Sequence, residues 1–227
     1  AGSPAIDRAD WWMAPPTDME GYARIDDPAT ANLGSLGYLE TSMGSSQYAA
    51  VGTAKGWRSN NTYWTLNFTG GFTFPFYETA YSSVTVSTEG FLKFAGALSA
   101  GDGDNTLEKL RDNRLIAPLW DNIRTNGTGD NIFVDDATPG QVTIRWDATN
   151  EVDDSDVQFS VTLFDTGVIQ FHYGLDNANL SPTVGISRGG NLRYLVSTYD
   201  SQTNLAGVDS MEIALTPGVG YADMGSF

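Results

Sequence analysis

The sequence predicts an all-β protein: an antiparallel, jelly-roll-like β-sandwich with an extended N-terminal arm and one short helix. Apolar residues recur at every second position through much of residues 72–173, which is the period of a half-buried strand. Within residues 157–163, every odd-numbered residue is apolar and every even-numbered residue is polar. Tight connections such as Asp165-Thr166-Gly167 separate successive segments, as is typical of sandwiches and jelly rolls.

Turn residues between the apolar segments locate the individual elements. One short helix is expected at Thr106–Asn113, because the Thr106 hydroxyl can cap its first turn and Glu108 places a carboxylate near the positive end of the helix dipole. The strands are expected, in chain order, at Thr62–Phe68, Phe72–Phe74, Ser83–Ser87, Phe91–Phe94, Leu115–Trp120, Ile132–Val134, Val142–Asp147, Val157–Phe164, Val168–Tyr173, Thr183–Ser187, Arg193–Thr198 and Met211–Leu215.

Residues 1–60 differ from the remainder of the chain. Small residues, Pro and Gly dominate this segment, and no apolar period persists in it. We therefore expect an extended arm at 1–60, with two short strands at Gly37–Leu39 and Gln47–Val51, followed by a sandwich domain at 61–227. The arm packs either on its own sandwich or on a neighbouring subunit, and the sequence leaves both alternatives open.

Three large apolar residues, Trp11, Trp12 and Met13, are adjacent within this arm. Successive side chains of a strand point to opposite faces, so one strand cannot bury both Trp rings on the same face. We predict that these three residues contact a partner, to which the arm adds a strand at a sheet edge.

The composition excludes several classes of function. The chain has 227 residues, a formal net charge of −16 and no cysteine. Nucleic acids and anionic membrane surfaces would be repelled, and disulfides, thiolate zinc sites and Cys nucleophiles are ruled out. No window has the roughly 18 apolar residues of a membrane span, so membrane insertion is not expected.

A series of short segments resembles a known family in its order and spacing. It is similar to the β-sandwich module of secreted bacterial and archaeal cell-surface proteins and to the nidogen-type (NIDO-like) extracellular domain, over roughly residues 65–190. The segments that carry the resemblance are Phe74-Pro75-Phe76-Tyr77, Val84–Phe94, Ile116–Asn122, Ile144–Trp146, Asp165–Tyr173 and Val184–Ile186.

The resemblance implies an extracellular, non-enzymatic module with an architectural or adhesive role, and it carries no catalytic residues over. Two positions depart from the family pattern. Glu89 stands where the family usually has Asn, and Asn122 stands where an acidic residue is common.

No set of residues indicates catalysis. The only histidine, His172, is expected on the outer face of its strand with no role, and the chain contains no G-x-S-x-G string. Glycosidases of this fold class need two converging carboxylates, but Glu78, Glu89 and Glu212 show no converging spacing. We therefore predict that the chain is not an enzyme.

Two acidic loops are candidates for Ca²⁺, which prefers six to eight hard oxygen ligands. Neither loop has the spacing of an EF-hand. The predicted ligands are Asp102, Asp104 and Asn105 in the first loop and Asp153, Asp154 and Asp156 in the second.

Aromatic residues outside the strongest core pattern suggest a second class of ligand. Trp57, Tyr63 and Trp64, together with the arm tryptophans, can stack on sugar rings, although packing in the core or arm is the simpler explanation for them.

The function predicted is a non-catalytic structural or adhesive module at the extracellular cell surface. It would be a self-assembling subunit of a fibre or layer joined by strand addition, with copies of itself or other surface proteins as partners. A Ca²⁺-dependent carbohydrate-binding module is the alternative, with glycans as partners. A β-sandwich glycoside hydrolase is the third and weakest hypothesis.

Overall fold

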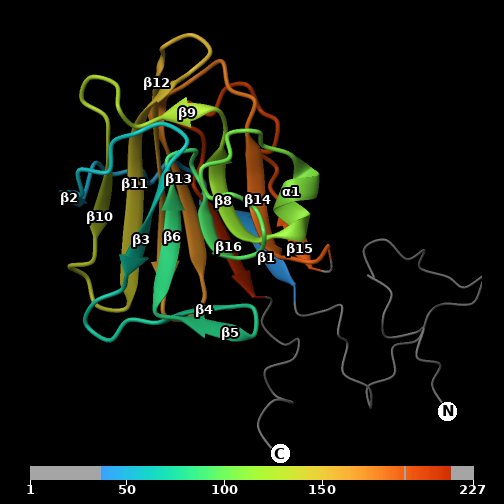
Figure 1. The fold of residues 1–227 in the computed structure, drawn as a ribbon. Coiled ribbons are helices and arrows are strands. Elements are labelled where there is room, and N and C mark those ends of the chain that lie inside the picture. Colours follow the sequence, from blue (N-terminus) through green and yellow to red (C-terminus); the bar gives the residue numbers. More distant parts are fainter. Residues whose placement is uncertain (1–36, 192, 216–227) are drawn as a thin grey trace, which may run out of the picture. The chain divides into compact units, whose positions relative to one another are not determined.

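The computed structural model describes residues 37–191 and 193–215 (Figure 1). Residues 40–214 form one compact unit, and the described residues 37–39 and 215 lie in a second one. Residues 40–60, assigned to the arm by the sequence pattern, therefore lie in the same unit as the sandwich strands. The division into an arm at 1–60 and a sandwich at 61–227 stays a prediction, because residues 1–36 lie outside the described part of the chain.

Two antiparallel sheets make up most of the described structure. In Figure 1, strands β3 (Tyr63–Asn67) and β6 (Ser83–Ser87) of one sheet lie in front of β11 (Gln141–Asn150) and β13 (Ile169–Asn177) of the other. In the first sheet β9 (Ile123–Arg124) pairs with β11 outside the main order. The other strands are, in spatial order, β1 (Tyr38–Ser42), β16 (Met211–Leu215), β13 (Ile169–Asn177), β12 (Asp156–Phe164), β11 (Gln141–Asn150), β10 (Asn131–Asp135) and β2 (Thr53–Ala54).

The second sheet has six strands, and a separate two-stranded sheet pairs β4 (Phe74–Phe76) with β5 (Thr79–Tyr81). The six strands are, in spatial order, β15 (Tyr194–Val196), β14 (Thr183–Arg188), β8 (Arg114–Trp120), β7 (Leu92–Ala95), β6 (Ser83–Ser87) and β3 (Tyr63–Asn67). The predicted all-β fold class, with antiparallel sheets and one short helix, is confirmed.

Several predicted boundaries are wrong. Gln47–Val51 is not a strand, and the short strand of this region is β2 instead. The strand predicted at Phe72–Phe74 begins only at Phe74, because the Phe72 N–H closes a turn on Thr69 O (3.0 Å). Strands β5 and β9 were not predicted, since three and two residues are too short to show a period.

Two buried hydrogen bonds connect the sheets through the core. Trp146 Nε1 donates to Ser87 O (2.8 Å), and the Tyr173 hydroxyl donates to Pro118 O (2.8 Å). Proline has no N–H for a strand ladder, and Pro118 lies where the pairing of β8 with β14 shifts register. The irregularity therefore frees a carbonyl that Tyr173 satisfies from the opposite sheet.

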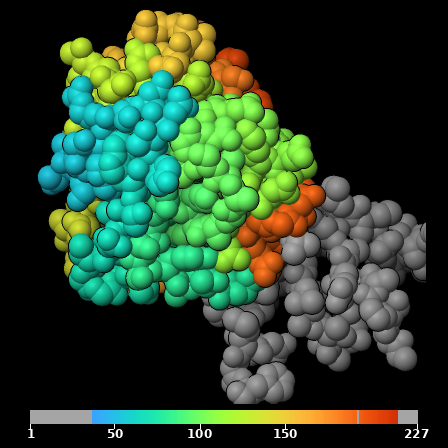
Figure 2. Space-filling view, viewed as in Figure 1, coloured from blue at the N-terminus to red at the C-terminus, as the bar shows by residue number. Residues whose placement is uncertain are grey.

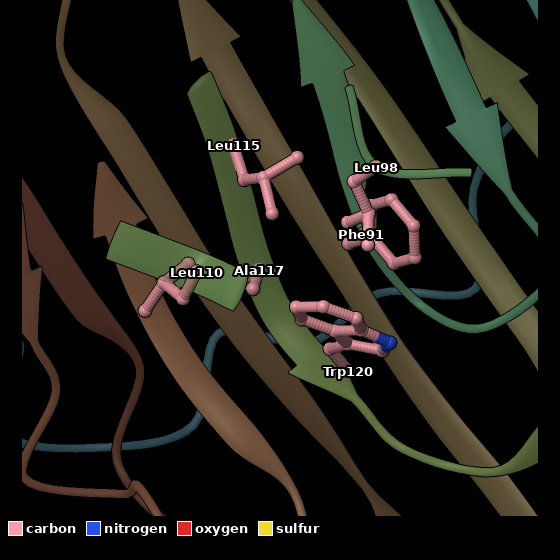
Figure 3. Close-up of a cluster of buried hydrophobic side chains, with 6 residues drawn as sticks. All are labelled: Phe91, Leu98, Leu110, Leu115, Ala117 and Trp120. Atoms are coloured by element: carbon pink, nitrogen blue, oxygen red, sulfur yellow. The ribbon is translucent and has the colours of Figure 1, made fainter. Parts of the chain in front are cut away.

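The helix α1 (Leu107–Asp112) closes one side of the core. Its cap is the predicted one, since the Thr106 side chain accepts a hydrogen bond from the Lys109 N–H (3.2 Å). Figure 3 shows its buried Leu110 near Ala117, with Trp120 between them and Phe91. Leu98 belongs to the same cluster, so the chain between β7 and α1 is anchored in the core.

The turn between β6 and β7 is fully buried, which is unusual for a connection that must satisfy its backbone groups. Gly90 has a φ of +83°, and a Cβ at this residue would overlap the Leu119 carbonyl oxygen. The Asp121 N–H donates to Glu89 O (3.2 Å). Only glycine permits this close approach, and the approach fixes the position of Glu89 beside it.

Replacing Gly90→Ala tests this close packing. We expect a loss of about 3 kcal/mol or more in the free energy of unfolding, because the methyl group meets a backbone carbonyl in addition to an unfavourable φ. Gly71→Ala is the matched control, since Gly71 has a similar φ of +78° and nothing within 4 Å of its Cβ position. The control should lose only ~1–2 kcal/mol. Equal losses in urea unfolding of the two variants would contradict the close approach.

Candidate functional site

An open depression lies between the segment before β3, the loop after β7 and the residues that follow β8. Its volume is about 450 Å³. Figure 2 shows the cyan surface of the chain before β3 against the green surface of the region that contains the loop after β7. The lining residues are Asn61, Gly101, Asp102, Gly103, Asp104 and Asn122.

Glu89 is buried under this depression, in the turn that Gly90 holds inside the fold. Its side chain has an exposed fraction of 0%. Glu89 Oε1 accepts hydrogen bonds from the Thr88 hydroxyl (2.7 Å) and from the Asn61 N–H (2.9 Å). Glu89 Oε2 has no hydrogen-bond partner within the described residues. The Ile123 N–H faces the carboxyl but donates to Asp121 O (2.9 Å).

Burial raises the pKa of the Glu89 carboxyl from 4.5 to about 7, because the charged form loses its hydration. Hydrogen bonds from Thr88 and Asn61 and the dipole of the Ile123 N–H oppose this rise, and the nearby negative charge of Glu151 adds to it. Near neutral pH the carboxyl is thus divided between its protonated and ionised forms.

Gly103 covers the free carboxylate oxygen together with two amide oxygens. A Cβ built on Gly103 would lie 2.9 Å from Glu89 Oε2, 3.1 Å from Asn122 Oδ1 and 3.4 Å from Asn61 Oδ1. Asn61 adopts a φ of +49°, in the left-handed region that Asn tolerates better than most residues. This conformation accompanies the donation of its N–H to Glu89 while its side chain lines the depression.

The covering loop is held in place from both ends. Trp120 Nε1, which points away from Leu110 in Figure 3, donates to Asp102 O (2.8 Å). The Leu98 N–H donates to Asn113 Oδ1 (3.0 Å). The core thus positions the loop directly above the oxygen cluster.

The first predicted Ca²⁺ loop already contains a cation, the ammonium of Lys109. Lys109 Nζ lies 3.0 Å from Asp102 Oδ2 and 2.7 Å from Asp104 Oδ2, and it donates to Asp104 O (2.9 Å). Asn105 does not join them, since its Nδ2 donates to Ser181 O (2.7 Å). The structure therefore brings Asp102 and Asp104 together around Lys109 and directs the Asn105 amide elsewhere.

The second predicted loop is satisfied in a similar way. Asp153 Oδ1 accepts from the Ser155 N–H (3.0 Å), and its Oδ2 accepts from Asn179 Nδ2 (2.6 Å). Asp154 pairs with Arg124 (2.7 Å), while Asp156 is exposed at the start of β12.

In the part of the chain that the structure describes, no group of three or more His, Cys, Asp or Glu side chains is placed to hold a metal. Ca²⁺ binding by the six predicted residues stays a prediction. The predicted partner contacts Trp11, Trp12 and Met13 lie outside the described residues.

The glutamates considered for glycosidase chemistry lie on separate elements with separate partners. Glu78 pairs with Arg188 (3.0 Å) and with Arg193, and Glu212 accepts from Gln170 Nε2 (2.9 Å). Glu89 is buried in the β6–β7 turn.

His172 faces away from the core residues of β13, as expected, but it is buried rather than exposed. Its Nδ1 lies 2.9 Å from Ser210 Oγ, and its Nε2 lies 3.5 Å from Thr162 Oγ1. The Gln47 N–H also donates to Ser210 Oγ (2.7 Å), so the chain between β1 and β2 reaches this face of the sheet. Burial lowers the pKa of His172 from 6.5 to about 4, which keeps the ring neutral in most conditions.

Sequence reasoning missed Glu89, Asn61 and Asn122 as a group. Glu89 lies between the strands predicted at Ser83–Ser87 and Phe91–Phe94, as the sequence indicated, but its burial was not predicted. The available signal was the pair of departures from the family pattern, an acid at 89 and an amide at 122, which the fold brings to the same point beside Gly103.

The family model described as NIDO-related matches residues 38–222, which is most of the chain. The chain belongs to the NIDO-related (nidogen-related) family. Neither a curated protein sequence nor a solved structure shows significant similarity to it. Domains of this family are in general extracellular and non-catalytic. No helix among the described residues of this NIDO-related chain has the length and apolar character needed to cross a bilayer.

The variant Glu89→Gln tests the electrostatics of the site. Because the folded pKa is about 7 and the unfolded value is 4.5, the folded state holds the proton more tightly. Ionisation of Glu89 therefore costs stability progressively as the pH rises between these values, and the cost is constant above them. The free energy of unfolding of the variant, relative to that of wild type, should increase by about 3 kcal/mol between pH 4.5 and pH 8. Urea unfolding in metal-free buffer measures this difference.

His172 titrates in both proteins, so its effect cancels in this difference. Glu108→Gln, a change of the same charge at an exposed residue, is the matched control. A stability difference between Glu89→Gln and wild type that does not change with pH would contradict the raised pKa, because it would mean that water hydrates the Glu89 carboxyl.

Proposed function

We propose that this NIDO-related chain is a non-catalytic structural or adhesive module of an extracellular surface. It associates with copies of itself, or with other surface proteins, by adding a strand to its six-stranded sheet. The observation that carries this proposal is the open outer edge of β3.

Strand β3 is an outer strand with one paired side. It pairs with β6 in an unbroken antiparallel register. On its other side, the described residues provide no backbone hydrogen bond to Tyr63–Asn67. The unpaired N–H and C=O groups of an outer strand are a template for another strand.

The edge also lacks the usual protection against such pairing. Natural outer strands carry Lys, Pro or bulges that prevent addition. The β3 sequence Tyr-Trp-Thr-Leu-Asn has no charge and no proline, and Tyr63 has an exposed fraction of 53%. An outer strand whose backbone groups are unpaired and unprotected favours strand addition over simple solvation.

The N-terminal arm predicted from the sequence is the segment that we propose to supply the added strand in a neighbouring copy. Such a contact joins two different surfaces, so its repetition produces a filament unless the rotation closes a ring.

Placing a charge on the edge tests the proposal. Thr65 is exposed, and Thr65→Lys should block strand addition without altering the core. Light scattering should show assemblies of the wild-type chain, and monomers of Thr65→Lys and of a variant that lacks residues 1–30. Val152→Lys, the same change of charge at a loop residue with an exposed fraction of 76%, should assemble like wild type. A monomeric wild-type chain, or assembly unaffected by Thr65→Lys, would contradict strand addition at β3.

Carbohydrate binding is a second candidate, favoured by a pair of stacked tryptophans in β3 and the segment before it. The rings of Trp57 and Trp64 stack in parallel with 5.7 Å between centroids, and both are half-buried. Sugar rings stack on such surfaces while amides such as Asn61 bind hydroxyl groups.

A glycan array distinguishes this candidate from strand addition. Binding that weakens at least tenfold in Trp57→Ala and persists in Thr65→Lys would support it. An array with no binding by the wild-type chain would exclude it for the glycans presented.

A further inference from the structure

Three oxygen atoms meet at the Gly103 cradle, and none of them receives a hydrogen bond from the described residues. They are Glu89 Oε2, Asn61 Oδ1 and Asn122 Oδ1, all within 3.4 Å of the position that a Cβ on Gly103 would take, so they face the same side of this glycine. Of the three, only Glu89 Oε2 is buried, whereas Asn61 and Asn122 are exposed. A buried polar atom in a folded protein nearly always has a partner, and an exception such as Glu89 Oε2 calls for an explanation such as an ion. When Glu89 is ionised, its carboxylate and the two amide oxygens all carry negative charge or partial charge, so a cation among them is attracted to all three.

The local charges also favour a cation. Three carboxylates lie at or under the depression, those of Glu89, Asp102 and Asp104. The nearby ammonium of Lys109 already donates to Asp102 Oδ2, Asp104 Oδ2 and Asp104 O, which uses all three of its hydrogens. No donor of Lys109 therefore remains for Glu89.

We infer that the oxygen cluster of Glu89, Asn61 and Asn122 binds a hard divalent cation, of which Ca²⁺ fits best. The site differs from the two acidic loops that the sequence suggested, because its only charged ligand is a buried carboxylate on the β6–β7 turn. The inference is independent of strand addition at β3.

The donor set selects the class of ion. Carboxylate and amide oxygens are hard ligands that suit Ca²⁺ and Mg²⁺, whereas zinc and copper prefer the nitrogen and sulfur atoms that this cluster lacks. Mg²⁺ requires a nearly ideal octahedron, while Ca²⁺ accepts an irregular shell completed by water. An open depression with exposed Asn61 and Asn122 provides that irregular, hydrated shell.

Ligand count and geometry set the expected affinity and the role of Gly103. Ca²⁺–oxygen distances are about 2.3–2.6 Å, so the exposed amides must move slightly toward the ion. One charged ligand in an open site corresponds to a Kd of about 10⁻⁴–10⁻³ M, as in other extracellular modules. A side chain at residue 103 would occupy the cradle and exclude the ion.

Isothermal titration of the full chain with CaCl₂ at pH 8, after removal of metals with a chelator, tests the inference. Wild type should bind one Ca²⁺ with a Kd of about 10⁻⁴–10⁻³ M. Glu89→Gln should weaken binding at least tenfold, and urea unfolding should show that this variant is folded and more stable than wild type at that pH. Gly103→Ala should also lose binding, and circular dichroism checks its fold.

The control Glu108→Gln changes the charge equally at an exposed residue outside the cluster and should bind like wild type. Absence of Ca²⁺ binding to the wild type up to 20 mM CaCl₂, far above the expected Kd, overturns the inference. Binding that survives in Glu89→Gln and disappears in Asp102→Asn or Asp154→Asn also overturns it, since the ion would then belong to an acidic loop.

Discussion

The close approach of Gly90 to the Leu119 carbonyl is the constraint on which the candidate site depends. It draws the β6–β7 turn into the interior, where Phe91 enters the core cluster on one side of the turn. On the other side Glu89 is carried into the same interior, since its backbone carbonyl is bonded to the Asp121 N–H. The burial of a carboxylate is thus a consequence of how two strands of one sheet connect, and Glu89 is not placed by any charge partner of its own.

The carboxylates in this turn and in the loop above it differ in the partners that stabilise them. Asp102 and Asp104 share Lys109, which lies at the start of α1, and these three groups are at least partly in contact with water. Ion pairs of this kind contribute little to stability, about 0–1 kcal/mol, and they mainly fix the conformation of the loop. Glu89 receives two hydrogen bonds on one oxygen and none on the other. The unpartnered oxygen lowers the stability of the fold, and an ion bound there would remove this destabilisation. Functional sites in folded proteins often contain groups that are unfavourable for stability in this way.

The alternation of residues 157–163 predicted β12 correctly because strand periodicity is local, and Thr106 predicted the helix start because capping is local as well. The sequence could predict only some of the ion-pair partners of the two acidic loops. Lys109 follows Asp104 by five residues, so a counter-ion was foreseeable there, whereas the pairing of Arg124 with Asp154 requires the fold.

The oxygen cluster depends wholly on tertiary structure. Asn61, Glu89 and Asn122 come from three turns separated by about thirty residues each, and no local rule brings them together. The burial of His172 was not predicted, for a related reason. Period-two patterns identify the face of a strand but not whether another segment covers that face, as the chain near Gln47 does.

The most direct test of this account is a ¹³C NMR titration of the Glu89 carboxyl carbon in metal-free buffer, with the signal assigned by its absence in Glu89→Gln. A buried carboxyl with one unpartnered oxygen should titrate with a midpoint of about 7. A midpoint near the ordinary value of 4.5 would show that water or another donor reaches Glu89, and would contradict both the buried turn and the cation site built on it.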